Sequence, residues 1–171
     1  MFLRSISAAL GGCVLLLAPA ASTAADRGPS TTEERKQALD IIQRFQADPL
    51  DPALKQEQKW VVQWMMEIPD VHVDLCAILD KLPKGDKKDG LTLFTAMIFA
   101  QTAFVLRNPH KQDDQLAQYQ AGVEGVLQIY EVLLKAKPKD RQSYLDDLIE
   151  RRAAGTLVQL VKERADVACH K

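Results

Sequence analysis

The sequence has little of what marks the common functional classes. It holds 8 glycines, 8 prolines, 3 cysteines and 3 histidines in 171 residues, and aromatic residues make up only 6%. Neither sign of charge dominates, because 22 basic side chains face 23 acidic ones. A near-zero net charge lacks the basic excess typical of proteins that bind nucleic acid through its phosphates. The chain has no Walker loop, dinucleotide-binding glycine motif, serine elbow or zincin motif, so it indicates no cofactor and no catalytic residue.

What is present is a globular composition. Apolar residues reach 47% and charged residues 26%, which excludes a disordered chain. The length suits one ordinary domain. No segment alternates apolar and polar residues for long enough to predict a β-strand, so we expect an all-α fold.

The first 25 residues have the order of a secretory signal peptide. Arg4 precedes the apolar run Ile6–Leu17, and small residues lead to a cleavage point after Ala24 or Ala25. An uncleaved anchor needs about 18 apolar residues, more than this run provides. A lipoprotein signal ending at Cys13 is the other alternative. We therefore predict an exported protein, periplasmic or extracellular. The single asparagine, Asn108, precedes proline and forms no glycosylation sequon, which favours a bacterial periplasm.

The mature chain reads as a flexible lead-in over residues 26–31 and a single helical domain over 32–171. Apolar spacing and proline positions predict six or seven helices, at about 32–47, 52–68, 70–82, 91–106, 113–137, 139–153 and 156–168. Helix 91–106 is apolar on nearly all sides, so we expect it at the centre of a compact bundle, packed like a helical hairpin. It is short and carries Gln101, so no membrane span is expected after signal cleavage.

One segment resembles a known repeat. Val126–Pro138 is similar to the second helix of a tetratricopeptide repeat, with its aromatic residue and closing proline. In that register Ala117 and Asp114 stand where an aromatic residue and a glycine belong, and no second copy occurs at the repeat offset. We interpret the segment as an amphipathic helix ended by proline, with a degenerate repeat as the alternative.

Two cysteines remain after signal cleavage. An even pair in an exported chain predicts a disulfide between Cys76 and Cys169. The alternative is a metal site or a thiol enzyme built from His72, Cys76, Cys169 and His170. His72 and Cys76 would share one face of the predicted helix 70–82, but Cys169 and His170 are adjacent, which is poor ligand spacing.

Four further residues are candidate partner contacts. Trp60 and Trp64 lie one turn apart and could stack on a sugar or a partner, although core packing is the favoured explanation. Gly122 and Gly125 interrupt a strong helix, either for a close helix crossing or for contact with a ligand or partner. We expect a non-enzymatic helical protein that binds another envelope or secreted protein. The alternatives are the enzyme or metal protein above and a carrier of a small apolar ligand.

Overall fold

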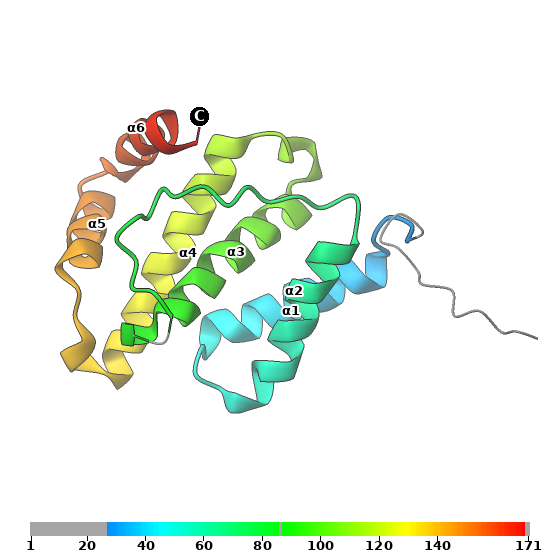
Figure 1. Cartoon of the computed structure of the whole chain (residues 1–171), viewed down its shortest axis with the longest axis horizontal. Coiled ribbons are helices and arrows are strands. Elements are labelled where there is room, and N and C mark those ends of the chain that lie inside the picture. Colours follow the sequence, from blue (N-terminus) through cyan, green and yellow to red (C-terminus); the bar gives the residue numbers. More distant parts are fainter. Residues whose placement is uncertain (1–26, 86, 170–171) are drawn as a thin grey trace, which may run out of the picture.

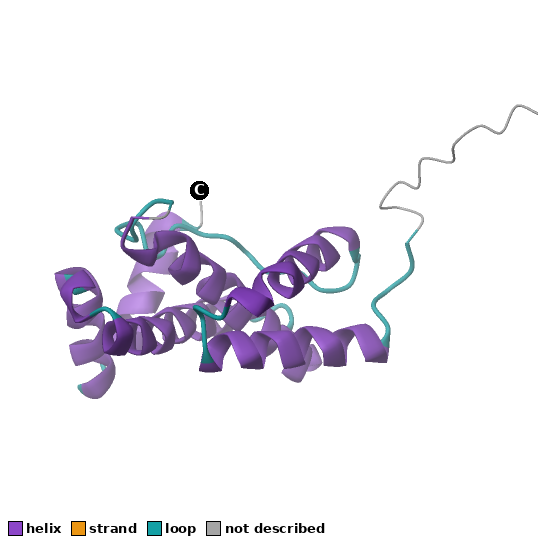
Figure 2. Ribbon diagram, turned by 90° about the horizontal axis from the view of Figure 1, so that it is seen from below, coloured by secondary structure: helices purple, strands orange, loops and turns teal. Residues whose placement is uncertain are grey.

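The computed structural model describes residues 27–85 and 87–169, and in these ranges the chain is all-α (Figure 1). The helices are α1 (Thr32–Ala47), α2 (Lys55–Glu67), α3 (Gly90–Arg107), α4 (Gln115–Ala136), α5 (Ser143–Ala153) and α6 (Leu157–Ala168). Figure 2 shows helices joined by loops, without a strand in the described ranges. The all-α prediction is confirmed, with six α-helices in these residues.

α3 and α4 form an antiparallel pair at the centre of the molecule (Figure 1). They share the most extensive contact between any two elements, while α1 packs on α3, and α5 and α6 pack on α4. Leu93 and Phe99 of α3 are fully buried, and Phe99 meets Phe45 of α1 edge to face at 5.3 Å. The prediction of a central apolar helix at 91–106 is therefore confirmed.

Prolines and caps set the ends of the helices. Pro52, Pro109 and Pro138 each open a single turn of 3-10 helix between longer helices, because proline fits the first helical position but not the interior. At the start of α1, the Thr31 hydroxyl accepts from the Glu34 N–H, and the Glu34 carboxylate accepts from the Thr31 N–H. This reciprocal pair satisfies two donors that the helix leaves unpaired.

The predicted helix from Asp70 to Leu82 is wrong. Residues 70–82, here called the strap, run as an irregular segment across α3 and α4 (Figure 1). Asp70 does not cap a helix, because its carboxylate accepts hydrogen bonds from Ser30 and Arg35. Leu75, expected on the apolar face, is exposed. A short segment between prolines 69 and 83 has little helical stability of its own, so its tertiary contacts decide its path.

Most predictions about the N-terminal segment concern residues outside the described ranges. The signal peptide 1–25, its cleavage point and the Cys13 alternative lie outside the described residues. Within the lead-in, Arg27 forms ion pairs with Glu34 and with Glu67, the latter at 3.0 Å. Ser30 donates to Asp70 from both its backbone N–H and its hydroxyl. These contacts join the start of α1 to α2 and the strap; flexibility of the lead-in stays a prediction.

One helical stretch of the described residues, Lys87–Arg107, is long and apolar enough to cross a membrane by length and composition. Its most apolar window has a mean hydropathy of 1.5, and 56% of that window is buried inside the fold. The central helix of a globular core has the same composition, so this stretch is weak evidence for a span.

Candidate functional site

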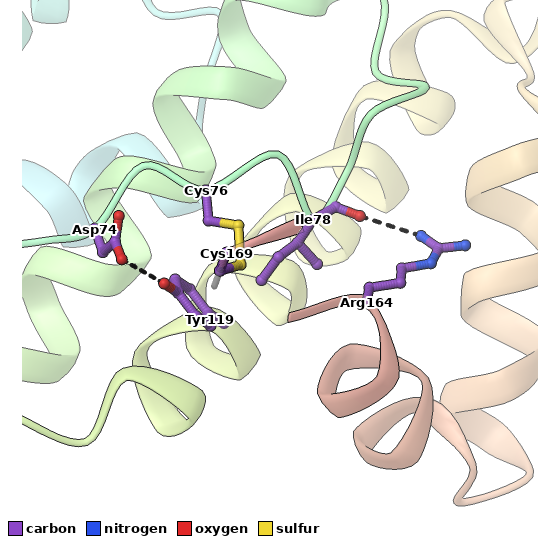
Figure 3. The surroundings of a disulfide bond; sticks show 6 residues. All are labelled: Asp74, Cys76, Ile78, Tyr119, Arg164 and Cys169. Carbon is purple, nitrogen blue, oxygen red and sulfur yellow. Dashed lines mark hydrogen bonds between the residues drawn. A yellow bond between two sulfur atoms is a disulfide. The ribbon is translucent and has the colours of Figure 1, made fainter. Parts of the chain in front are cut away.

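Three side-chain interactions hold the strap to α4 and α6 (Figure 3). The pairs are Asp74 with Tyr119, Cys76 with Cys169, and Ile78 with Arg164. The Tyr119 hydroxyl donates to Asp74 Oδ2 at 2.5 Å, and the Arg164 guanidinium donates to the Ile78 carbonyl at 3.4 Å. Burial, with the hydrogen bond and charge of Asp74, raises the pKa of Tyr119. The phenol therefore stays protonated and keeps its bond to the carboxylate at neutral pH.

The disulfide between Cys76 and Cys169 is present as predicted, with the two Cα atoms 5.5 Å apart. In this form neither sulfur is a thiolate, so neither can ligate a metal or attack a substrate. His72 is exposed, and its Nε2 lies 2.8 Å from the Pro69 carbonyl oxygen. His170 lies outside the described residues. Among the described residues, no group of three or more His, Cys, Asp or Glu side chains could hold a metal ion.

The two tryptophans of α2 pack against the core of the fold. Their rings stack at 5.8 Å between centroids with planes 14° apart. Trp64 is buried, and Trp60 is partly buried against both apolar clusters of the core. Their contacts within the fold account for these residues, and a role in partner binding is a separate prediction.

Gly122 and Gly125 lie where α4 crosses α3. A Cβ atom added at Gly125 would stand 2.3 Å from the Cβ of Ala100, and one at Gly122 would meet Gln101 and Met97 at about 3.0–3.1 Å. The missing side chains therefore allow the two central helices to approach closely. Gly125 also borders a shallow surface hollow, so a partner contact there stays a prediction.

A large apolar hollow lies between α2 and the first turns of α3. This α2–α3 groove has a volume of about 860 Å³. Four large apolar side chains line it and remain accessible to solvent: Leu50, Val62, Met66 and Leu91. Met66 is 79% exposed and Leu91 is 57% exposed. Phe94, one turn beyond Leu91 on α3, is also exposed, so the apolar surface continues along that helix.

Lysines stand on the α2 side of the groove. Lys55 and Lys59, one turn apart, line it together with the apolar residues. Neither lysine forms an ion pair with a described residue. Two carboxylates, Asp51 and Glu67, also line the groove, and Glu67 is paired with Arg27. The groove therefore combines an exposed apolar floor with charges of both signs.

Sequence reasoning did not identify this groove. The face of α2 that carries Lys55 and Lys59 reads as a solvated surface, yet Val62 and Met66 lie on that same side, four residues apart. Apolar residues at helical spacing on a lysine-bearing face were the available signal. The position of Leu91 opposite them depends on the packing of two helices that are far apart in the sequence.

No family model matches the chain, and no significant match was found among curated proteins or solved structures.

Proposed function

We propose that this is an exported, non-enzymatic helical protein that binds another envelope or secreted protein through the α2–α3 groove. The observation that carries the proposal is the exposed apolar floor formed by Leu50, Val62, Met66 and Leu91. Contiguous apolar surface with a polar rim is typical of a docking site, because its exposure to water is unfavourable until a partner covers it.

The shape of the groove favours a helical partner segment. Val62 and Met66 form a ridge one turn apart on α2, and Leu91 and Thr95 form another on α3. An amphipathic helix with apolar residues three or four positions apart would pack between such ridges. Asp51 and Glu67 also line the groove, but Glu67 is paired with Arg27, whereas Lys55 and Lys59 form no ion pair with a described residue. We therefore expect acidic residues of the partner beside the two lysines.

Export is supported by the signal-peptide pattern of residues 1–25. N-terminal sequencing of the protein purified from its native cells should give a chain that begins at Ala25 or Asp26. A chain that retains Met1, or one that begins at a lipidated Cys13, would contradict a soluble exported form.

Site-specific photo-crosslinking in the native cells tests the groove. A photoreactive residue is placed at Met66, and a control is placed at Val167, which is equally exposed on α6. We expect a discrete adduct at Met66 and none at Val167, with the crosslink mapped by mass spectrometry to an acidic amphipathic helix of the partner. No adduct specific to Met66, or a crosslinked segment without acidic amphipathic character, would reject the proposal.

A charge reversal sharpens the test. Lys55→Glu with Lys59→Glu should reduce adduct formation at Met66 by at least about tenfold, because acidic partner residues would meet like charge. Lys139→Glu with Lys162→Glu, at two exposed lysines outside the groove, is the matched control, and it should leave the adduct unchanged. Equal yields in the two variants would show that the lysines do not select the partner.

The groove volume also supports a second candidate, the small apolar-ligand carrier. A hollow of about 860 Å³ lies in the range of small-molecule sites. Native mass spectrometry of the purified protein would detect a co-purified lipid. A stoichiometric lipid that Met66→Glu removes would replace the protein-partner proposal with this one.

A further inference from the structure

A second apolar hollow lies where the end of the strap meets the first turns of α3. This strap hollow has a volume of about 550 Å³. Among the described residues, its lining and that of the α2–α3 groove share Leu91 alone. Three large apolar side chains that line the hollow are accessible to solvent, with Leu75 54%, Leu91 57% and Phe94 42% exposed. Gathered apolar exposure of this kind marks an interaction surface, and most of this one lies outside the groove.

The hollow carries one charge of each sign. Among the described residues that line it, Asp80 is the one acidic side chain and Lys84 is the one basic side chain. Both are exposed, and neither forms an ion pair with a described residue. A partner that covers the apolar side chains must therefore offer an anion to Lys84 and a cation to Asp80. This chain presents both groups, beside apolar side chains, on the hollow itself.

Local contacts hold this surface in place. The Leu91 N–H donates to the Gly85 carbonyl oxygen at 2.7 Å, which closes the turn after the strap onto the start of α3. Gly90 permits the closure, because a Cβ atom there would stand 2.1 Å from the Pro83 carbonyl oxygen. Cys76, which also lines the hollow, ties the strap to the end of α6 through the disulfide. A surface that is ordered before binding loses little conformational entropy when it is covered.

We propose that the strap hollow is the interface of a twofold symmetric dimer, in which it binds the same hollow of a second copy of this chain. A twofold axis that passes between Asp80 and Lys84 sets Asp80 of each copy opposite Lys84 of the other. The exposed apolar side chains of the two copies then cover one another beside these pairs. An anionic membrane or an acidic helix is a poorer occupant, because it would place negative charge beside Asp80.

Sedimentation equilibrium of the mature, disulfide-bonded protein tests the dimer. We expect the average mass to rise from that of a monomer towards that of a dimer as the concentration increases from about 1 to about 500 μM. A monomer at every concentration would overturn the proposal. A mass that rises beyond that of a dimer would also overturn it, because a twofold interface is closed after two copies.

Reversal of each charge tests the pairing directly. Lys84→Asp makes both charges of the hollow negative, and Asp80→Lys makes both positive. Each variant alone should therefore dimerise at least about tenfold more weakly than the parent. An equimolar mixture of the two should form a heterodimer at least as tight as the parent dimer, because every charge then meets its opposite. Parental dimerisation of either variant alone, or no heterodimer in the mixture, would reject the pairing.

Matched controls lie outside the hollow. Lys162→Asp on α6 and Asp113→Lys before α4 reverse exposed charges, and they should dimerise like the parent, alone and mixed. Leu75→Asp should weaken the dimer by at least about tenfold, whereas Val167→Asp, at a more exposed position on α6, should not. Circular dichroism checks that each variant keeps the parental helix content. Equal weakening by Leu75→Asp and Val167→Asp would overturn the assignment of the interface to the strap hollow.

Photo-crosslinking in the native cells separates a second copy from other occupants. A photoreactive residue at Leu75 should give an adduct with the mass of two chains, crosslinked to the same hollow. An adduct with a different protein or with a lipid would overturn the proposal. The adduct expected at Met66 reports on the α2–α3 groove independently, since Met66 does not line the strap hollow. Loss of the dimer with the Met66 adduct kept would refute the dimer alone, and the reverse result would refute the groove alone.

Discussion

At the scale of single residues, two carboxylates hold the irregular strap to distant parts of the chain. Burial acts to raise the pKa of Asp70, but hydrogen bonds from Ser30 and Arg35 and the charge of Arg35 outweigh it, so the pKa is lowered. Asp74 accepts the Tyr119 hydroxyl in a similar long-range contact. Side chains that are distant in sequence therefore fix the path of this segment.

The lowered pKa of Asp70 gives a pH-dependent stability. A carboxyl group with a depressed folded-state pKa stabilises the fold above its unfolded pKa, and this contribution is lost as the pH falls through the folded value. Asp70→Asn should lower the free energy of unfolding at pH 7 by about 1–2 kcal/mol. The difference from the parent should shrink below about pH 4. Urea unfolding across pH measures this, with the exposed Glu33→Gln as control. A constant difference down to pH 2 would contradict the assignment.

At the scale of elements, α3 has two faces with different roles. Most of its surface packs against α1 and α4, while Leu91 and Phe94 reach the solvent near its first turns. A helix that is apolar nearly all round is expected in a core, and the exposed part is the portion that neighbouring elements leave uncovered. Leu91, with Thr92 and Thr95, forms one wall of the groove, and Phe94 borders the strap hollow.

Two substitutions on α3 distinguish these faces. Phe99→Asp should prevent folding, because an unpaired carboxylate at a position with 0% exposure costs more than about 4 kcal/mol. Phe94→Asp, on the exposed side, should change the free energy of unfolding by less than about 1 kcal/mol. Circular dichroism and thermal melts compare the variants with the parent. If both variants melt like the parent, Phe99 is not buried in the core as the structure places it.

At the scale of the whole molecule, the disulfide joins the middle of the chain to its C-terminal helix. Cys76 lies on the strap and Cys169 follows α6, at a sequence separation of 93. Terminal helices fray unless they are tied down. The bond, with the Arg164 contact to the Ile78 carbonyl, attaches α6 to the segment that crosses the central pair.

Removal of the disulfide should be costly. The chain-entropy model gives about 4–5 kcal/mol for a loop of this length, and measured losses are often smaller. The variant that combines Cys76→Ser with Cys169→Ser should therefore unfold at clearly lower urea concentration than the oxidised parent. The reduced parent is its control, and the two should unfold together. Two alkylatable thiols in the native protein, or an unchanged midpoint in the variant, would contradict the structural role of the bond.

The sequence alone determined the features that depend on local pattern. Helical periodicity and the proline positions predicted the six observed α-helices. The spacing of apolar residues favours a helix, and proline ends it. The central place of α3 followed from its composition, which leaves no polar face for solvent. The Cys76–Cys169 pairing followed from arithmetic, since only two cysteines remain beyond the predicted signal peptide.

Tertiary structure decided the strap and the α2–α3 groove. Apolar residues of the strap fit a helical pattern, but local propensity is weak over so few residues, and contacts of Asp70, Asp74 and Cys76 with distant elements outweigh it. The α2–α3 groove needs Met66 and Leu91 on facing helices. Such sites arise where segments far apart in sequence meet, so periodicity within one segment carries no signal for them.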